Sequence, residues 1–176
     1  CEYTCSHIIY ETINYHREKT TKSCIEFASS AQALVDATQN LNKDNYLNFV
    51  NTNLYEQFYT LLNQTNGLGH IYIYGPNKEC NMYPINENFS YTTPNHEIYD
   101  SYNIHLGESY VEIEYDDNYQ NDMMFYSYPI VKDNSLLFVI TFVFDFNYIR
   151  DNIIKSIKNE TMTLIYVLEN NDMYKI

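Results

Sequence analysis

The segment Phe125–Ile149, FYSYPIVKDNSLLFVITFVFDFNYI, holds two strand-like runs with a short polar turn between them. Apolar and aromatic residues in short runs with a period of two are typical of β-strands, so we expect strands over Met123–Val131 and Leu136–Phe144. The turn Lys132–Ser135 is short enough to pair these strands as an antiparallel hairpin. Isoleucines at helical spacing follow, and they predict a helix that Asn147 caps.

The second of these strands has two chemically different faces. Alternate positions on one face are all Phe or Ile, which predicts a core packed against a long helix. These positions are Phe138, Ile140, Phe142, Phe144 and Phe146. The opposite face carries Thr141 and ends at Asp145, and a carboxylate on a sheet face needs a partner because burial of an unpaired charge is costly.

A long helix is expected near the start of the chain. From about Ile9 to Thr38 there is no Pro or Gly, and apolar or small residues recur every three or four positions. That period is typical of one helix face. Because about thirty residues form a rod ~45 Å long, we expect this helix to project from the body of the domain. A second amphipathic stripe, from Leu47 to Leu61, predicts a shorter helix that ends before Gly67.

A hairpin and a long loop lie between the helices and the later strands. His70–Tyr74 alternates like a strand, Gly75–Lys78 has turn composition, and Cys80–Tyr83 resumes the alternation. Residues 85–107 are rich in Asn, Ser and Thr and predict a loop. A further strand is expected over Ser109–Glu114.

We therefore divide the chain into three parts. Residues 1–40 form the long N-terminal helix, residues 41–158 form the central domain, and residues 159–176 alternate like one more hairpin. This hairpin either adds to the central sheet or begins a truncated second module. The chain begins within a helical pattern and stops within a strand pattern, so we expect it to be excised from a longer protein.

Composition excludes several classes of function. The chain has 176 residues, with Lys+Arg 10 against Asp+Glu 23, and its formal net charge is −13. Nucleic-acid affinity comes mainly from cationic contacts to phosphate, so we expect no nucleic-acid partner. No apolar run approaches the ~20 residues of a membrane helix. No Gly-x-Ser-x-Gly motif or paired Cys and His indicates catalysis, so we expect neither an enzyme nor a cofactor.

Metal and disulfide patterns are weak. The four cysteines, Cys1, Cys5, Cys24 and Cys80, include no Cys-x-x-Cys pair, and their pairing stays open. Cys24 lies on the apolar stripe of the long helix, where a plain buried thiol is the ordinary role. The ranges His96–His105 and Asp116–Asp122 contain metal-ligand residue types. Neither range has the spacing of a known metal motif, so solvated loops are favoured and no metal is expected.

Two segments resemble a known family. His70–Pro84, HIYIYGPNKECNMYP, and Phe125–Ile149 resemble the opening and closing hairpins of the extracytoplasmic, PAS-like sensor modules called Cache domains. The order of elements over roughly residues 8–158 is also similar to that family. The resemblance implies an α+β fold, in which the long N-terminal helix packs on a central antiparallel PAS-like sheet.

The function implied by the resemblance is small-molecule sensing outside the cytoplasm, either periplasmic or extracellular, by a membrane-anchored receptor. Ligand binding would shift the terminal helices, and a homodimer through the long helix is part of that scheme. The output domain of the receptor stays open between a histidine kinase, a cyclic-di-nucleotide enzyme and a chemoreceptor. The alternative is a secreted or cell-surface interaction module with a Tyr-rich binding face.

Candidate ligand contacts follow from strand alternation. His70, Tyr72 and Tyr74 alternate with isoleucines in the first strand, and Tyr126 and Tyr128 alternate with other residues in a later one. A Tyr ring offers an apolar body with one polar tip, which suits a small polar or aromatic ligand. Ordinary packing is the alternative for each of them, because the chain contains 20 Tyr.

Thr141 and Asp145 complete the candidate site. The resemblance places the carboxylate that holds a ligand amine at Asp145, while its position at a strand end equally predicts a cap for the next helix. Family members that bind free amino acids use an Arg and a Trp for the ligand carboxylate. This chain has no Trp, and its only arginines are Arg17 and Arg150 on predicted helices, so the sequence does not support an amino acid held in that way.

Overall fold

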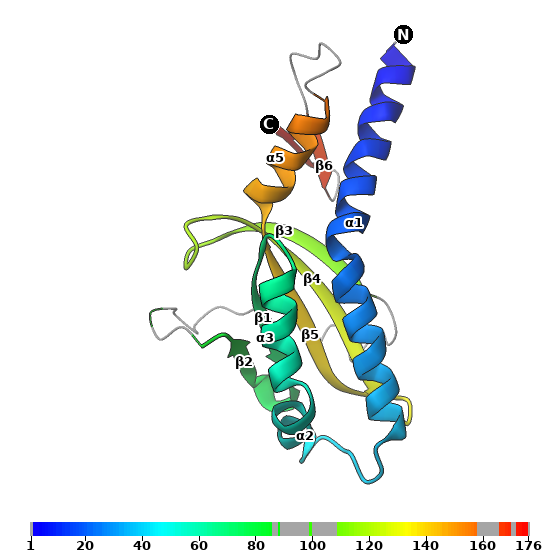
Figure 1. Cartoon of the computed structure of the whole chain (residues 1–176), viewed down its shortest axis with the longest axis vertical. Helices are drawn as coiled ribbons and strands as arrows, with labels where there is room; N and C mark the ends of the chain where they lie inside the picture. The colour runs from blue at the N-terminus through cyan, green and yellow to red at the C-terminus, as the bar shows by residue number, and fades with distance from the viewer. Residues whose placement is uncertain are drawn as a thin grey trace.

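A single long helix, α1 (Glu2–Ala37), runs along one side of a five-stranded sheet (Figure 1). At 36 residues it is ~54 Å long, and its upper half extends past the sheet. The expected long helix is confirmed, and it starts earlier than its apolar stripe. The computed structural model describes residues 2–85, 88, 99, 109–157, 166–169 and 172–175.

The second predicted helix is divided in two. α2 (Tyr46–Asn53) and α3 (Tyr55–Gln64) are separated by Leu54 alone, whose φ of −113° departs from the helical value. Backbone bonds continue through this residue, since the Leu54 N–H donates to Val50 O at 2.9 Å. The amphipathic stripe did not reveal the division because its spacing continues across it.

The sheet is antiparallel throughout and has the strand order β2-β1-β5-β4-β3. A short 3-10 turn, η1 (Pro76–Lys78), joins its first two strands. Its strands are β1 (Leu68–Tyr74), β2 (Cys80–Tyr83), β3 (Tyr110–Asp116), β4 (Asn121–Lys132) and β5 (Ser135–Asp145). The predicted strands are thus confirmed, with ends that differ by one or two residues, and the fold class is the expected helix-on-sheet α+β arrangement.

The β4–β5 connection is a two-residue turn. Lys132 pairs with Ser135, and the intervening Asp133 and Asn134 have φ values of 49° and 60°. Positive φ at both central positions is the geometry of a type I′ turn, which Asp and Asn tolerate better than most residues. The register then shifts by one residue between Ile130 and Val131.

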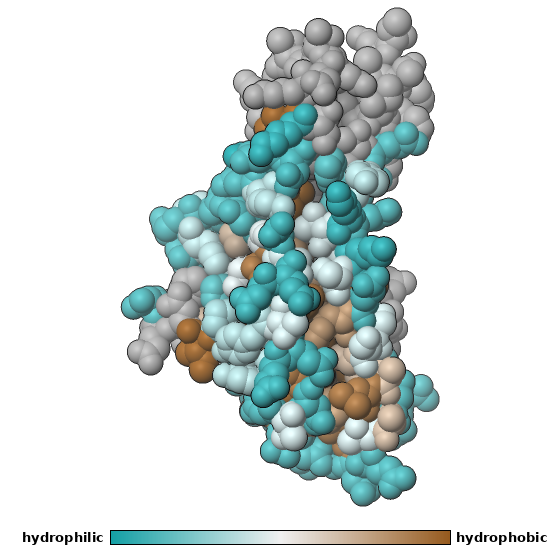
Figure 2. Space-filling model, viewed as in Figure 1, coloured by the Kyte–Doolittle hydropathy of each residue, from teal (hydrophilic) through white to brown (hydrophobic). Residues whose placement is uncertain are grey.

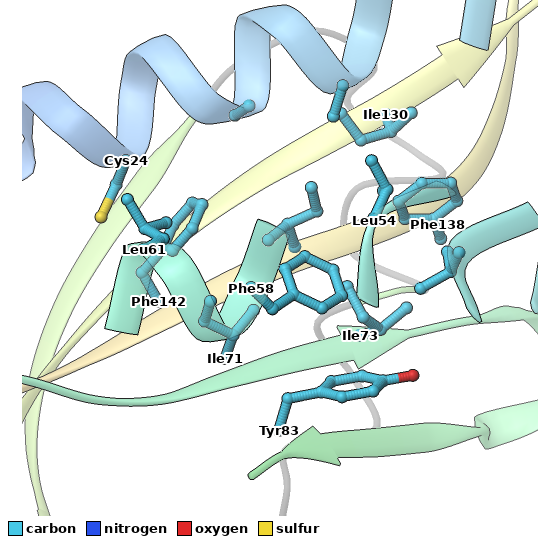
Figure 3. Close-up of a cluster of buried hydrophobic side chains, with 14 of the residues drawn as sticks. Cys24, Leu54, Phe58, Leu61, Ile71, Ile73, Tyr83, Ile130, Phe138 and Phe142 are labelled. Atoms are coloured by element: carbon cyan, nitrogen blue, oxygen red, sulfur yellow. The ribbon is translucent and has the colours of Figure 1, made fainter. Parts of the chain in front are cut away.

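The main core lies between the sheet and the helices (Figure 3). Cys24 of α1 and Phe58 of α3 face Ile71 of β1, Ile130 of β4 and Phe142 of β5, all fully buried. Small residues at Ala28 and Ala31 of α1 let the helix approach the sheet closely. The Phe/Ile face of β5 belongs entirely to this core, as predicted: Phe138, Ile140, Phe142, Phe144 and Phe146.

The chain continues into α5 (Phe146–Ile157), which packs against α1 and extends past the sheet on the same side (Figure 1). A separate two-stranded sheet follows, made of β6 (Tyr166–Glu169) and β7 (Asp172–Lys175). This hairpin does not join the five-stranded sheet. Its assignment to a second module remains a prediction.

Hydrophilic residues cover most of the helix side of the molecule, with small hydrophobic spots near the end where α2 lies (Figure 2). Among the residues that the structure describes, no helix is both long enough and apolar enough to cross a membrane.

Candidate functional site

The sheet has a second face, turned away from α1, which we call the far face. A separate hydrophobic cluster covers it, distinct from the helix-side core. Its buried members are Tyr72, Tyr74, Met82, Tyr99, Met123, Phe125, Leu136, Val139 and Val143. An antiparallel sheet often leaves one face to solvent. Here both faces carry a buried apolar cluster, so the far face is not left open to solvent.

Two buried hydroxyl groups lie in the middle of this face. Ser127 on β4 and Thr141 on β5 pair in the register, are 2% and 0% exposed, and their oxygens are 2.8 Å apart. On the other side of Thr141, Tyr72 of β1 is its register partner. Three hydroxyl-bearing residues therefore form one row across three central strands. A hydroxyl group can both donate and accept a hydrogen bond, so this row is the part of the far face that could recognise the polar atoms of a ligand.

A second set of polar side chains, His70 and Tyr119, lies next to Tyr72 and near the β3–β4 turn. The Tyr119 hydroxyl contacts Nδ1 of His70, with the two rings 5.4 Å apart, and Tyr119 is also hydrogen-bonded to Tyr72. Burial lowers the pKa of His70, while the charge of Asp116 acts in the opposite direction. Burial, followed by the nearby Tyr72, raises the pKa of Tyr119 well above its usual range. At neutral pH these side chains are thus uncharged hydrogen-bonding groups.

The other end of the far face is closed by tyrosines. Burial raises the pKa of Tyr74, whose side chain is hydrogen-bonded to the Cys80 thiol. Tyr99, 6% exposed, packs into the far-face cluster and donates its hydroxyl to the Leu136 carbonyl at 2.9 Å. Tyr99 itself is therefore anchored on this face near the start of β5.

Asp145 caps α5. Its Oδ1 accepts the Asn147 N–H at 2.9 Å and the Asn121 side-chain amide at 3.0 Å, and the Asn147 amide donates to Asn121 Oδ1 at 2.7 Å. The N-cap of α5 is thus Asp145, whereas the sequence pattern predicted Asn147. The capping alternative for Asp145 is confirmed, whereas its contact with a ligand stays a prediction.

The predicted site residues divide between the two faces. His70, Tyr72 and Tyr74 lie on the far face with Thr141, and Asp145 lies at its end. These five residues form one group.

Tyr126 and Tyr128 do not join the group. Tyr126 stacks on Phe142 in the helix-side core, with ring centroids 6.3 Å apart, and Tyr128 packs against the same core. Strand alternation grouped both tyrosines with Asp145 as candidate ligand contacts, and the prediction that they lie on the same sheet face as Asp145 is wrong. The cause is the register shift in β4–β5, since one extra residue in a strand reverses which face every later side chain occupies.

Three residues of the site were missed. Ser127 is on the far face because of the same register shift, which the alternation of β4 alone does not reveal. Tyr119 belongs to a turn, and Tyr99 belongs to the predicted loop, so neither follows a strand pattern. The density of tyrosines in those two segments was the available signal.

Metal binding and disulfides find no support in the described residues. Where side chains are described, no group of three His, Cys, Asp or Glu residues could hold a metal ion. Cys24 and Cys80 are free thiols, and burial raises the pKa of each to about 12. Cys24 is therefore the plain buried thiol that was expected. Cys1 and the range His96–His105 except Tyr99 lie outside the described residues, and the side chain of Cys5 is not described, so the pairing of Cys1 and Cys5 stays open.

Comparison with solved structures identifies the fold. The sensory domain of the Campylobacter jejuni chemoreceptor Tlp3 (CcmL) with isoleucine bound matches at a TM-score of 0.67 and 12% identity, covering 96% of this chain and 66% of that one. The ligand-binding domain of Tlp3 in complex with L-valine matches at a TM-score of 0.66 with 12% identity and the same coverage. This chain has the fold of a Cache sensor domain.

The Cache fold was expected from the two hairpin segments and the order of elements, and that expectation is confirmed. No protein-family description and no curated protein sequence matches the chain. The chain spans about two thirds of the length of the Tlp3 sensory domains it matches. At 12% identity the likeness concerns the fold alone.

Proposed function

We propose that this chain is the extracytoplasmic small-molecule sensing domain of a membrane receptor, and that its ligand binds on the far face of the sheet. The observation that carries the proposal is the row of Tyr72, Thr141 and Ser127, which sets buried hydroxyl groups in a tyrosine-rich face. The fold supports it, because the Tlp3 domains that share this fold are sensory domains with isoleucine or L-valine bound. The receptor's output remains open between a histidine kinase, a cyclic-di-nucleotide enzyme and a chemoreceptor.

The charge around the far face favours a ligand with an amine over one that relies on a carboxylate. From Glu79 to Val131 the sequence contains no Lys or Arg. Lys132, the next cation, has its ammonium group bonded to the carbonyls of Val35 and Thr38 at the end of α1. An α-carboxylate on the far face would therefore find no Lys or Arg partner from this half of the sheet.

The same stretch is strongly acidic. Its acidic residues are Glu79, Glu87, Glu97, Asp100, Glu108, Glu112, Glu114, Asp116, Asp117 and Asp122. On β3, Val111 and Ile113 pack on the helix-side core, so alternation puts Glu112 and Glu114 on the far-face side. Burial, followed by the charges of Glu112 and Asp116, raises the pKa of Glu114. A cationic amine placed over the tyrosines would lower this repulsion and gain cation–π contact.

A set of three related compounds tests the ligand class by thermal shift. L-Valine carries an amine and a carboxylate, isobutylamine lacks the carboxylate, and isovalerate lacks the amine. We expect isobutylamine at 100 times its Kd to stabilise the chain by ~2.7 kcal/mol. L-Valine at the same concentration should stabilise it less. Isovalerate should not bind the far face, so any stabilisation that it gives should be unchanged in a far-face variant. An L-valine response larger than that of isobutylamine would contradict the charge argument while leaving the site itself intact.

Two conservative substitutions test the site. Tyr72→Phe removes a hydroxyl from the far face, and Tyr128→Phe is the matched control because Tyr128 packs on the helix-side core. We expect Tyr72→Phe to weaken amine binding about tenfold, equivalent to about 1.4 kcal/mol, and Tyr128→Phe to leave it unchanged. If both variants bind as the unmodified chain does, the ligand site is not the far face.

The route of signalling is part of the same proposal. α1 packs on β4 and on α5, so a ligand that moves the sheet changes contacts along both helices. A homodimer through α1 would pass this change to a second copy. Light scattering should then give a dimer mass that Lys22→Glu on the exposed side of α1 reduces to the monomer mass.

The alternative, an interaction module with a Tyr-rich surface, finds less support. The described tyrosines that are exposed, Tyr15, Tyr55, Tyr115 and Tyr148, belong to four different elements. Tyr72, Tyr74, Tyr99 and Tyr126 are buried. Within the described residues, the tyrosines thus line the interior of the far face and the core more than they form one flat outer patch.

A further inference from the structure

A separate groove lies where α1, the end of α3 and the start of α5 meet. Figure 1 shows the start of α5 near the end of α3 at one end of the sheet, with α1 passing beside them. The groove has a volume of about 370 Å³, which is within the range of small-ligand sites of about 300–1,000 Å³. It belongs to none of the functions proposed above.

The lining of this groove is unusual for so acidic a chain. The nine lining residues whose side chains are described are all polar or carry a hydroxyl, and none of these nine is Asp or Glu. The chain as a whole has 23 acidic residues and a net charge of −13. A solvent-facing groove whose described lining has no carboxylate therefore differs from the rest of this acidic chain.

The one cationic side chain and the one imidazole among the described lining residues both come from α1. Lys19 and His16 both line it, three residues apart on one helix face. Burial lowers the pKa of His16, and the charge of Lys19 lowers it further. A negative ligand placed between them would reverse the second effect, because it would favour the protonated imidazole.

Hydroxyl and amide groups complete the lining. Thr20 and Ser23 of α1 face Thr65 at the end of α3, with Ser23 Oγ and Thr65 Oγ1 3.2 Å apart, and Asn152 of α5 lies opposite. Tyr148 of α5 also lines the groove, and its ring packs against Gly67. These groups come from three elements, so a ligand that bonds to them joins α1 to α5.

We propose that this groove binds a small organic carboxylate. One ammonium group, one imidazole and several neutral donors suit a single negative charge better than a phosphate dianion, which is ordinarily held by several cationic groups. The ligand would link α1 to α5 through Lys19, Thr20 and Asn152. It would thus act on the contact between the two helices that leave the sheet.

Acetate and acetamide are matched probes for this site, because they share size and shape and differ in charge. Titrations of the purified chain are followed by the NMR signals of the His16 ring at constant ionic strength. We expect acetate to shift these signals and to raise the pKa of His16, and acetamide to do neither. Equal responses to both probes, or no response to acetate up to about 100 mM, overturn the proposal.

Two lysine variants locate the charge. Lys19→Met should weaken acetate binding at least tenfold, while Lys22→Met, one turn along α1 and outside the groove, should leave it within twofold. Helical circular dichroism confirms that each variant is folded, and Lys19→Gln serves as a second test of the same position. Acetate binding that survives both Lys19 variants overturns the proposal. Tyr72→Phe on the far face should leave it unchanged, so this result is separate from the amine site.

Discussion

At the level of single residues, Asp145 joins the candidate site to the helix that follows it. Its Oδ1 accepts the Asn147 N–H in the first turn of α5 and the side-chain amide of Asn121 at the start of β4. An oxygen that accepts an N2 backbone N–H is the usual N-cap arrangement, with a typical worth of ~1 kcal/mol. Asp145 therefore fixes the entry of α5 whether or not a ligand is bound.

We expect Asp145→Ala to lower the free energy of unfolding by about 1 kcal/mol, because two hydrogen-bond donors lose their acceptor. Asp145→Asn should lose less, since its amide oxygen can still accept the Asn147 N–H. Urea unfolding followed by circular dichroism measures both. Equal stability of the Ala variant and the unmodified chain would contradict the cap assignment.

His70 predicts a pH dependence of stability. Because burial lowers its pKa in the folded chain, the folded state holds fewer protons than the unfolded state, in which the value is about 6.5. The stabilisation is therefore present above pH 6.5 and is lost as the pH falls toward the lower folded value. We expect the unfolding temperature to drop between pH 8 and pH 6.

A His70→Gln variant isolates this effect, because Gln keeps a hydrogen-bonding side chain and does not titrate. Its unfolding temperature should change less over the same pH range than that of the unmodified chain. His16→Gln is needed as a second variant, since the pKa of His16 is also lowered. If the unfolding temperature of the His70→Gln chain drops as much between pH 8 and pH 6, another group is responsible for the pH dependence.

Residue-level prediction succeeded where a period of two was enough. His70, Tyr72 and Tyr74 share a face because they lie on one strand. It failed where the register between strands decides the face. Next to the β4–β5 turn, Val131 pairs with Leu136. If that register continued along the strands, Tyr128 would pair with Val139 on the far face. The extra residue instead puts Ser127 opposite Thr141, and no local pattern in β4 encodes that.

At the level of elements, the end of α1 is fastened to β4 by side chains. Gln32 bonds both backbone groups of Val131, with distances of 2.7 and 2.9 Å, and thus takes the place of a neighbouring strand. Lys132 donates to Val35 O at 2.9 Å and Thr38 O at 2.8 Å. A cation at these carbonyls satisfies groups that a helix C-terminus leaves unpaired and interacts favourably with its dipole.

We expect Lys132→Met to destabilise the chain by about 1 kcal/mol and to increase amide hydrogen exchange in the last turn of α1. The methionine keeps the length of the side chain, so the change removes mainly the charge and the donor. Lys43→Met is the matched control, because Lys43 is exposed in the loop after α1. If both variants exchange alike, the Lys132 bonds contribute nothing to the end of the helix.

Element-level prediction was accurate for α1 and the five strands because each has a long uninterrupted pattern. It missed the division at Leu54, since an apolar residue at helical spacing looks the same in one helix or at the joint of two. It also placed the cap of α5 two residues late. Both Asp145 and Asn147 have cap chemistry, and only the position of the β5 end selects Asp145.

At the scale of the whole molecule, charge is distributed unevenly along the chain. The strands β3 and β4 and the segment before them carry acidic residues without Lys or Arg until Lys132, whereas Lys19 and Lys22 lie on α1. The two proposed sites follow this division, with an amine on the acidic far face and a carboxylate in the groove beside α1. The division was already in the sequence, but only the fold shows that the two regions lie at different faces of one domain.

The uneven charge also predicts a response to salt. With a net charge of −13, like charges repel in the compact state. Salt screens this repulsion more strongly as the Debye length falls from ~30 Å at 0.01 M to ~8 Å at 0.15 M. We therefore expect the unfolding temperature at pH 7.5 to rise by a few degrees when NaCl increases over this range. At about pH 5, close to the sequence pI of 4.6, most of the net charge is gone and the rise should be much smaller. The same rise at both pH values would mean that ion binding or another salt effect, and not repulsion across the acidic sheet, sets the stability.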